Sequence, residues 1–191
     1  PGHSLTRCFP ISGRAGLSLA FFALSLLSKE RAVSLPPALA AYEWILNRRS
    51  PGQSLKKTLP HFGMAALYVA VRSHQLGQTA QTGYWAGGWV PQMLTMVKGF
   101  GTYVKLMFIP YPLSVEYLFA VKHSVDVEVA LYGLLRLGLL GLAWKVRERS
   151  PLVSFGIFLF FISLAPVSNI VPIRAIINER FLYLGSAGFG L

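Results

Sequence analysis

Residues 129–166, VALYGLLRLGLLGLAWKVRERSPLVSFGIFLFFISLAP, decide the fold class. Two long apolar runs enclose a short basic segment, KVRERS, at 145–150. Runs close to this length can cross the ~30 Å hydrocarbon core of a bilayer as helices, and positive charge between two spans is typical of a cytoplasmic loop. The stretch therefore predicts a transmembrane helical hairpin.

The composition of the whole chain agrees with a membrane protein. Of its 191 residues, 53% are hydrophobic and only 13% are charged, and the mean hydropathy is +0.51. A soluble domain carries about a quarter charged residues. The net charge of +11 could indicate nucleic acid, but the basic residues lie at the ends of apolar segments and not on one polar face. Membrane topology and anionic lipid explain them better, so no nucleic-acid partner is expected.

We predict an all-α fold, a polytopic transmembrane helical bundle that forms one partial transmembrane domain over 1–191. The predicted spans cover about 11–28, 32–46, 58–72, 127–144, 151–166 and 181–191 onward. Residues 92–109 are interrupted by two lysines and bounded by prolines, which favours a re-entrant or interfacial helix. The chain lacks an initiating Met and ends inside an apolar segment, so it is expected to be an internal piece of a longer protein.

Basic segments set the predicted orientation. Residues 1–14, 47–57 and 145–149 hold nine Lys and Arg and one acidic residue, Glu148, which places them in the cytoplasm. Alternation then puts 28–31, 72–126 and 166–180 on the far side of the membrane. Residues 92–109 must begin and end on that far side, in agreement with a re-entrant path.

The far side nevertheless collects cations, namely Lys29, Arg31, Arg72, Arg174 and Arg180. Guanidinium groups bind phosphate through paired hydrogen bonds, so a lipid-linked phosphate or diphosphate would suit them. Glu30 and Glu179 would each orient a neighbouring base, or pair with one another across loops. A structural alternative is that Lys29–Glu30 and Glu179–Arg180 are ion pairs that fix helix ends at the headgroups.

Other chemistry finds little support. The single Cys8 excludes an internal disulfide and a cysteine metal site, and the four histidines have no ligand spacing, so no metal is predicted. The sequence has no P-loop, no G-x-S-x-G, no dinucleotide-type glycine pattern and no close carboxylate pair. Arg136 lies inside an apolar run and is expected to face another helix or a polar cavity.

Four local patterns carry a family resemblance. They are LSLLSKERAVSLPPALAAYEWIL at 24–46, YVKLMFIPYPLSVEY at 103–117, LAPVSNIVPI at 164–173 and NERFLYLGSAGFG at 178–190. In this order and spacing they resemble the membrane part of the transmembrane-and-TPR protein O-mannosyltransferases and their bacterial relatives. Those enzymes belong to the GT-C superfamily of polytopic glycosyltransferases. The resemblance covers about residues 15 to 191.

The resemblance implies a GT-C-like fold, a polyprenyl- or dolichyl-phosphate sugar as donor, and a protein or glycan acceptor on the far side. It implies no other cofactor. The catalytic carboxylate of such enzymes lies in an earlier loop, expected upstream of Pro1, so no catalytic residue is assigned here. TPR repeats usually follow the membrane part, and none is visible before Leu191. The donor-binding positions carried over or suggested by charge are Lys29, Glu30, Arg31, Glu116, Tyr117, Ser168, Asn169, Arg174, Glu179 and Arg180. Where the family often has Asp before Tyr, this chain has Glu116.

Two alternatives stay open from the residues. A transporter or flippase for a lipid-linked solute would use the same cations, with Arg136 as a waypoint. A non-catalytic membrane subunit of a larger complex would instead dock partners on far-side loops. Each reading predicts a multi-pass membrane location, in the bacterial inner membrane or, in a eukaryote, the endoplasmic reticulum.

Overall fold

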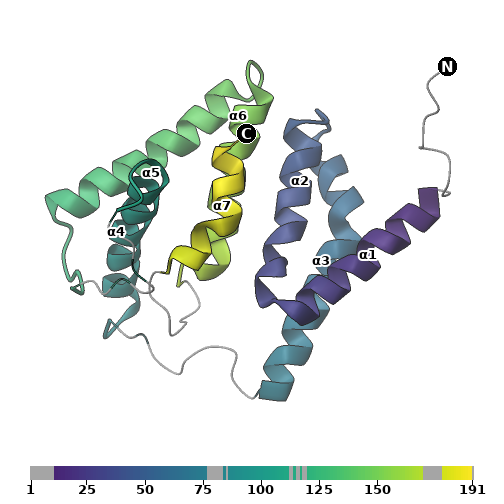
Figure 1. The fold of residues 1–191 in the computed structure, drawn as a ribbon, viewed down its shortest axis with the longest axis horizontal. Helices are drawn as coiled ribbons and strands as arrows, with labels where there is room; N and C mark the ends of the chain where they lie inside the picture. Colours follow the sequence, from purple (N-terminus) through teal and green to yellow (C-terminus); the bar gives the residue numbers. More distant parts are fainter. Residues whose placement is uncertain are drawn as a thin grey trace.

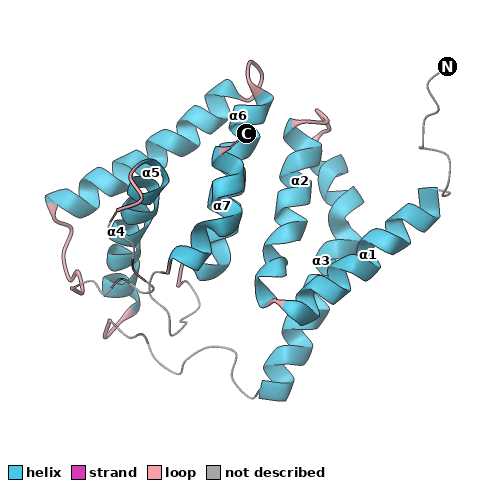
Figure 2. Ribbon diagram, viewed as in Figure 1, coloured by secondary structure: helices cyan, strands magenta, loops and turns pink. Residues whose placement is uncertain are grey.

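The protein is helical throughout the part of the chain that can be described. This computed structural model describes residues 11–76, 84, 86–111, 114, 117, 120–169 and 178–190, and no strand occurs within those ranges (Figure 2). The predicted all-α fold is therefore confirmed for these residues.

Seven α-helices and three short 3-10 turns follow one another within the described ranges. They are α1 (Ile11–Ser28), η2 (Glu30–Ser34), α2 (Leu35–Ile45), α3 (Pro51–Leu76), α4 (Trp89–Phe108), α5 (Val127–Val146), α6 (Pro151–Leu164), η3 (Ala165–Val167), η4 (Glu179–Phe181) and α7 (Leu182–Phe189). Helix α2 packs against both α3 and α6, and α6 also packs against α5 and α7 (Figure 1). Helix α1 lies against α3, and α4 lies against α5.

The helices differ in their suitability for crossing a membrane. By length and composition, α5 is the one helix of the described residues that is long and apolar enough. Two further segments, Ala15–Ser28 and Pro151–Val167, are apolar but shorter. The helices thus coincide with the predicted spans in position, while the structure supports a membrane crossing by length only at α5.

The predicted basic loop at 47–57 is mostly helix. Helix α3 begins at Pro51, so only 46–50 connects it to α2. Proline is suited to the first helical turn, where its missing N–H has no partner to lose. The hydroxyl oxygen of Ser50 accepts a hydrogen bond from the backbone N–H of Gln53 at 3.3 Å, as a capping residue does. This Ser-Pro start explains why α3 is longer than the predicted span at 58–72.

Connections gather at two opposite ends of the bundle (Figure 1). At one end, the α2–α3 and α5–α6 connections meet, where the Arg48 guanidinium donates to the Glu148 carbonyl at 3.5 Å. At the other end, the α1–α2 reversal meets the start of α7, where the Arg31 guanidinium donates to the Arg180 carbonyl at 2.6 Å. The basic connections therefore share one end, and the Lys29–Arg31 reversal shares the other with Arg180.

The chain returns to the start of α4 after that helix ends. The Gln92 side-chain amide donates to the Asn169 carbonyl at 2.8 Å, which places the beginning of α4 beside the end of α6. The backbone N–H of Lys122 donates to the Thr95 hydroxyl at 3.0 Å, one helical turn further on. Gln92 and Lys122 thus lie in the same region. Residues 92–108 form one continuous helix, and the re-entrant path expected for 92–109 stays a prediction.

Helices α6 and α7 approach most closely where glycines face each other. Gly156 of α6 lies against the carbonyl of Gly188 in α7, and Gly185 faces the ring of Phe160. Small residues let two helix backbones approach, which is the usual way to gain packing between apolar helices. This contact sets the position of α7, and hence of η4 just before it.

Substitution of Gly156 should test this packing. A methyl group at Gly156 would collide with the Gly188 carbonyl, a backbone atom that cannot rotate away. We expect Gly156→Ala to destabilise the protein by about 1–3 kcal/mol, measured as thermal unfolding in detergent micelles by circular dichroism. Gly138→Ala in α5 is the control, because nothing lies within 4 Å of its Cβ position and alanine favours helix. Equal stability of the two variants would contradict the proposed contact.

Candidate functional site

A polar cavity of about 510 Å³ lies at the end of the bundle where α1 reverses into α2. Its lining comes from the end of α1, from η2, from α3, from η3 and from η4. The lining residues that carry charge are Lys29, Glu30, Arg31, Arg72 and Arg180. The cavity thus holds four cations against one carboxylate.

Local sequence explains why the reversal presents these side chains. Lys29 is extended, and the 3-10 turn η2 follows at Glu30–Ser34. The Ser34 hydroxyl donates to the Arg31 carbonyl at 2.9 Å and closes the turn. Pro36 then occupies the first turn of α2, where its fixed backbone angle suits a helix start. Three consecutive charged residues are therefore held at one helix junction.

Arg31 and Arg180 share one aromatic ring. The Arg31 guanidinium carbon lies 4.0 Å from the centre of the Phe181 ring, and that of Arg180 lies 5.5 Å from it. Among the described residues, neither guanidinium has an ion pair with a carboxylate. Burial, and after it the positive charge of Arg180, lowers the pKa of Arg31. Two like charges held beside one ring attract an anion, because an anion relieves their repulsion.

The one carboxylate of the cavity is already engaged. Glu30 forms an ion pair with Arg72 of α3, and the same guanidinium donates to the Tyr68 hydroxyl at 2.9 Å. Tyr68 and Arg72 are four residues apart, which puts them on one helix face. The ion-pair partner of Glu30 is therefore Arg72, and the alternative of a Lys29–Glu30 ion pair is wrong for the described residues. Lys29 itself has no ion pair within the ranges described.

Glu179 directly precedes Arg180 in the sequence but does not line the cavity. Its carboxylate accepts hydrogen bonds from the backbone N–H of Ser114 and, at 2.7 Å, from the Tyr117 hydroxyl. Burial, followed by this hydrogen bond, raises the pKa of Tyr117. Glu179 therefore holds the segment that follows α4, and the structure shows no Glu179–Arg180 ion pair within the described residues. The predicted pairing of Glu179 with a neighbouring base is wrong.

Ser168 and Asn169 shape the turn after α6 and do not line the cavity. The Ser168 hydroxyl donates to the Ala165 carbonyl at 2.7 Å. Asn169 is completely buried, with a φ of 56°, and its amide nitrogen lies 3.4 Å from the Met96 sulfur. Asparagine tolerates this left-handed conformation better than most residues. The predicted positions Glu116 and Arg174 lie outside the described residues.

Sequence reasoning missed two contributors to the cavity, Tyr68 and Phe181. The i, i+4 spacing of Tyr68 and Arg72 is a signal that could have found the first. Phe181 directly follows Arg180 in the sequence. Its contact with Arg31 as well depends on how closely η2 approaches η4, and no local sequence pattern predicts that approach. Arg136, the waypoint of the transporter hypothesis, does not line the cavity and lies 5.6 Å from the Phe100 ring.

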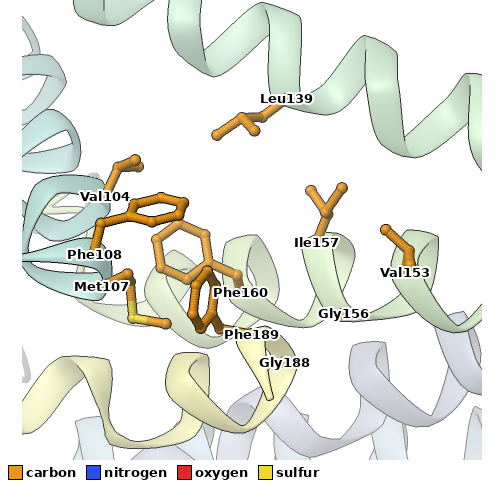
Figure 3. A pocket seen from close by; sticks show the side chains of 10 residues that line it. All are labelled: Val104, Met107, Phe108, Leu139, Val153, Gly156, Ile157, Phe160, Gly188 and Phe189. Atoms are coloured by element: carbon orange, nitrogen blue, oxygen red, sulfur yellow. The ribbon is translucent and has the colours of Figure 1, made fainter. Parts of the chain in front are cut away.

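A second cavity, of about 310 Å³, lies between α4, α5, α6 and α7 (Figure 3). Its lining side chains are apolar and include Met107, Leu139, Phe160 and Phe189. It offers no group that could bind or transfer a proton. No cluster of three or more His, Cys, Asp or Glu side chains that could hold a metal ion occurs in the part of the chain described.

Comparison with known proteins leaves the chain without an assigned relative. No family model, no curated protein and no solved structure matches the sequence or the fold.

Anion binding to the polar cavity should depend on both arginines and on the ring between them. We expect Arg31→Gln or Arg180→Gln to weaken binding of inorganic diphosphate by more than about tenfold, as loss of a charged hydrogen bond does. Phe181→Leu keeps the charges but removes the ring, and we expect it to weaken diphosphate binding severalfold. Isothermal titration calorimetry of the protein in neutral detergent measures both. Lys105→Gln, an exposed cation of α4, is the control; a loss as large as that of Arg180→Gln would contradict a specific site.

Proposed function

We propose that this chain is the donor-binding membrane part of a GT-C-type glycosyltransferase, which takes a sugar from a polyprenyl- or dolichyl-phosphate carrier on the non-cytoplasmic side. The observation that carries the proposal is the pair Arg31 and Arg180 on the Phe181 ring, with no carboxylate partner among the described residues. The four sequence patterns that resemble O-mannosyltransferases supply the reaction class.

The exposed surface of the helices supports a membrane location. Leu27 of α1 is 76% exposed, and Leu134 and Leu137 of α5 are each 68% exposed. A water-soluble monomer rarely exposes such leucines in contiguous patches, whereas lipid chains cover them without cost. In this proposal α1, α2, α3, α5, α6 and α7 form the polytopic bundle, and α4 with its return segment is re-entrant.

The chemistry of the cavity suits a phosphate leaving group. When the glycosyl bond of a lipid-linked sugar breaks, negative charge grows on the phosphate oxygens. Guanidinium groups that are already in place stabilise that charge, because they need little reorganisation as it develops. Arg31 and Arg180 would bind the phosphate, and Lys29 would add a third positive charge at the entrance.

The acceptor must be activated by a group outside this cavity. Glu30 is the one carboxylate of its lining, and its ion pair with Arg72 holds it in place. A base that is committed to an arginine is poorly suited to take a proton. The proposal therefore keeps the catalytic carboxylate upstream of Pro1, as the family resemblance implies.

Sugar transfer provides the direct test. In the parent protein, we expect Arg180→Gln to lower kcat about hundredfold or more, because it removes a donor to the charge that develops in the transition state. Arg180→Lys keeps the positive charge but loses the paired hydrogen-bond geometry of a guanidinium. Its kcat should lie between that of the parent and that of Arg180→Gln. The assay follows transfer from a radiolabelled polyprenyl-phosphate sugar, with membrane abundance measured alongside. Lys105→Gln should retain the parent rate. Full activity of Arg180→Gln would exclude the proposed role.

Orientation in the membrane gives a second test, independent of catalysis. Single cysteines placed at Lys29 and Arg180, in a Cys8→Ser background, should react with an impermeant maleimide added from the non-cytoplasmic side. Cysteines placed at Lys56 and Arg149 should react only from the cytoplasmic side, because those residues lie at the opposite end of the bundle. Labelling of Lys29 and Arg180 positions from opposite sides would rule out a shared cavity in the membrane.

A further inference from the structure

The end of the bundle opposite the polar cavity is strongly basic. We call this surface the basic end; its cations are Arg48, Arg49, Lys56, Lys57, Lys145, Arg147 and Arg149. They lie on the α2–α3 connection with the start of α3, and on the end of α5 with the α5–α6 connection. The Arg48–Glu148 hydrogen bond joins these two regions. Two carboxylates, Glu43 and Glu148, stand against these seven cations.

The two carboxylates neutralise only part of this charge. Glu43 is buried and forms ion pairs with Lys57 and, at 2.9 Å, with Arg49. Glu148 lies 3.5 Å from Arg147. The remaining cations have no ion pair with a carboxylate of the described residues; these are Arg48, Lys56, Lys145 and Arg149. A surplus of positive charge therefore remains on one surface.

A tryptophan pair fixes where this charge lies relative to the apolar helices. The rings of Trp44 in α2 and Trp144 in α5 are 5.5 Å apart. The Arg147 guanidinium lies 4.9 Å from the first ring and 4.7 Å from the second. Tryptophan prefers the boundary between headgroups and hydrocarbon, where its ring is apolar and its N–H is wet. The guanidinium over both rings then lies at the level of the lipid phosphates.

We infer that the basic end binds the phosphate headgroup of an anionic phospholipid, with the lipid chains lying along α5. The occupant must be amphipathic, because Trp144 is 60% exposed and Leu142 is 46% exposed directly beside Lys145. A soluble anion would leave this apolar surface uncovered. A phospholipid covers it with its chains while its phosphate contacts the cations. This site is separate from the polar cavity, and it rests on the proposed membrane location but not on sugar transfer.

Fluorescence quenching by brominated lipids tests the inference on the full chain. Trp85→Phe and Trp89→Phe leave Trp44 and Trp144 as the two tryptophans. The protein is reconstituted in phosphatidylcholine vesicles that contain equal fractions of brominated phosphatidylglycerol or brominated phosphatidylcholine. We expect stronger quenching by the anionic lipid, and a preference that falls as salt is raised.

Charge removal then identifies the residues. Each of Lys145→Gln and Arg149→Gln should lower the relative affinity for phosphatidylglycerol about fivefold, the share of one cation near an anionic surface. Lys105→Gln, an exposed cation of α4 outside both the basic end and the polar cavity, should leave the preference unchanged. Equal quenching by both lipids, or an unchanged preference in the Lys145→Gln/Arg149→Gln variant, would overturn the lipid site while leaving the proposed transfer reaction untouched. Quenching by neither lipid would overturn the membrane location and with it both proposals.

Discussion

Arg31 and Arg180 lie beside one phenyl ring, and neither has an ion pair with a carboxylate of the described residues. The function that we propose rests on this pair. Arg31 and Arg180 are 149 positions apart in the chain, yet the first donates a hydrogen bond to the backbone of the second. Phe181 lies within reach of both guanidinium groups. The Phe181 ring and the Arg180 carbonyl offset part of the repulsion between the two cations.

Packing far from the cavity makes that arrangement possible. The glycine contact between α6 and α7 holds α7 close to α6, and η4 is continuous with the start of α7. Helix α2 in turn packs on α6, and η2 precedes it directly. Arg31 and Arg180 are therefore carried on two elements that share α6 as their common support. Gly156 and Gly188 do not line the polar cavity, yet their close approach helps to set where Arg180 lies relative to Arg31.

Charge is divided between the two ends of the bundle in different ways. At the basic end, Glu43 and Glu148 each have an arginine or lysine partner, and Arg147 lies over the rings of Trp44 and Trp144. At the cavity end, the single carboxylate Glu30 is held by Arg72, which leaves Arg31, Arg180 and Lys29 facing the cavity. We propose the first end as a site for a membrane lipid and the second as a site for a phosphate group.

Composition and hydrophobic runs were enough to predict an all-helical chain, the approximate helix positions and the Lys29–Arg31 reversal, because apolar periodicity and proline placement act locally. The alternation of basic segments along the chain also predicted that Arg180 and Lys29 lie on the same side of the membrane. The partners of the charged residues could not be predicted from the sequence. Glu30 forms an ion pair with Arg72, and Glu179 accepts hydrogen bonds from Ser114 and Tyr117, instead of pairing with a sequence neighbour. An ion pair depends on distance in space, and side chains next to each other on a turn commonly point apart. Only the tertiary packing of α2, α3, α6 and α7 decided which charged side chains formed ion pairs and which of the described ones did not, because an ion pair needs the two groups close together in space.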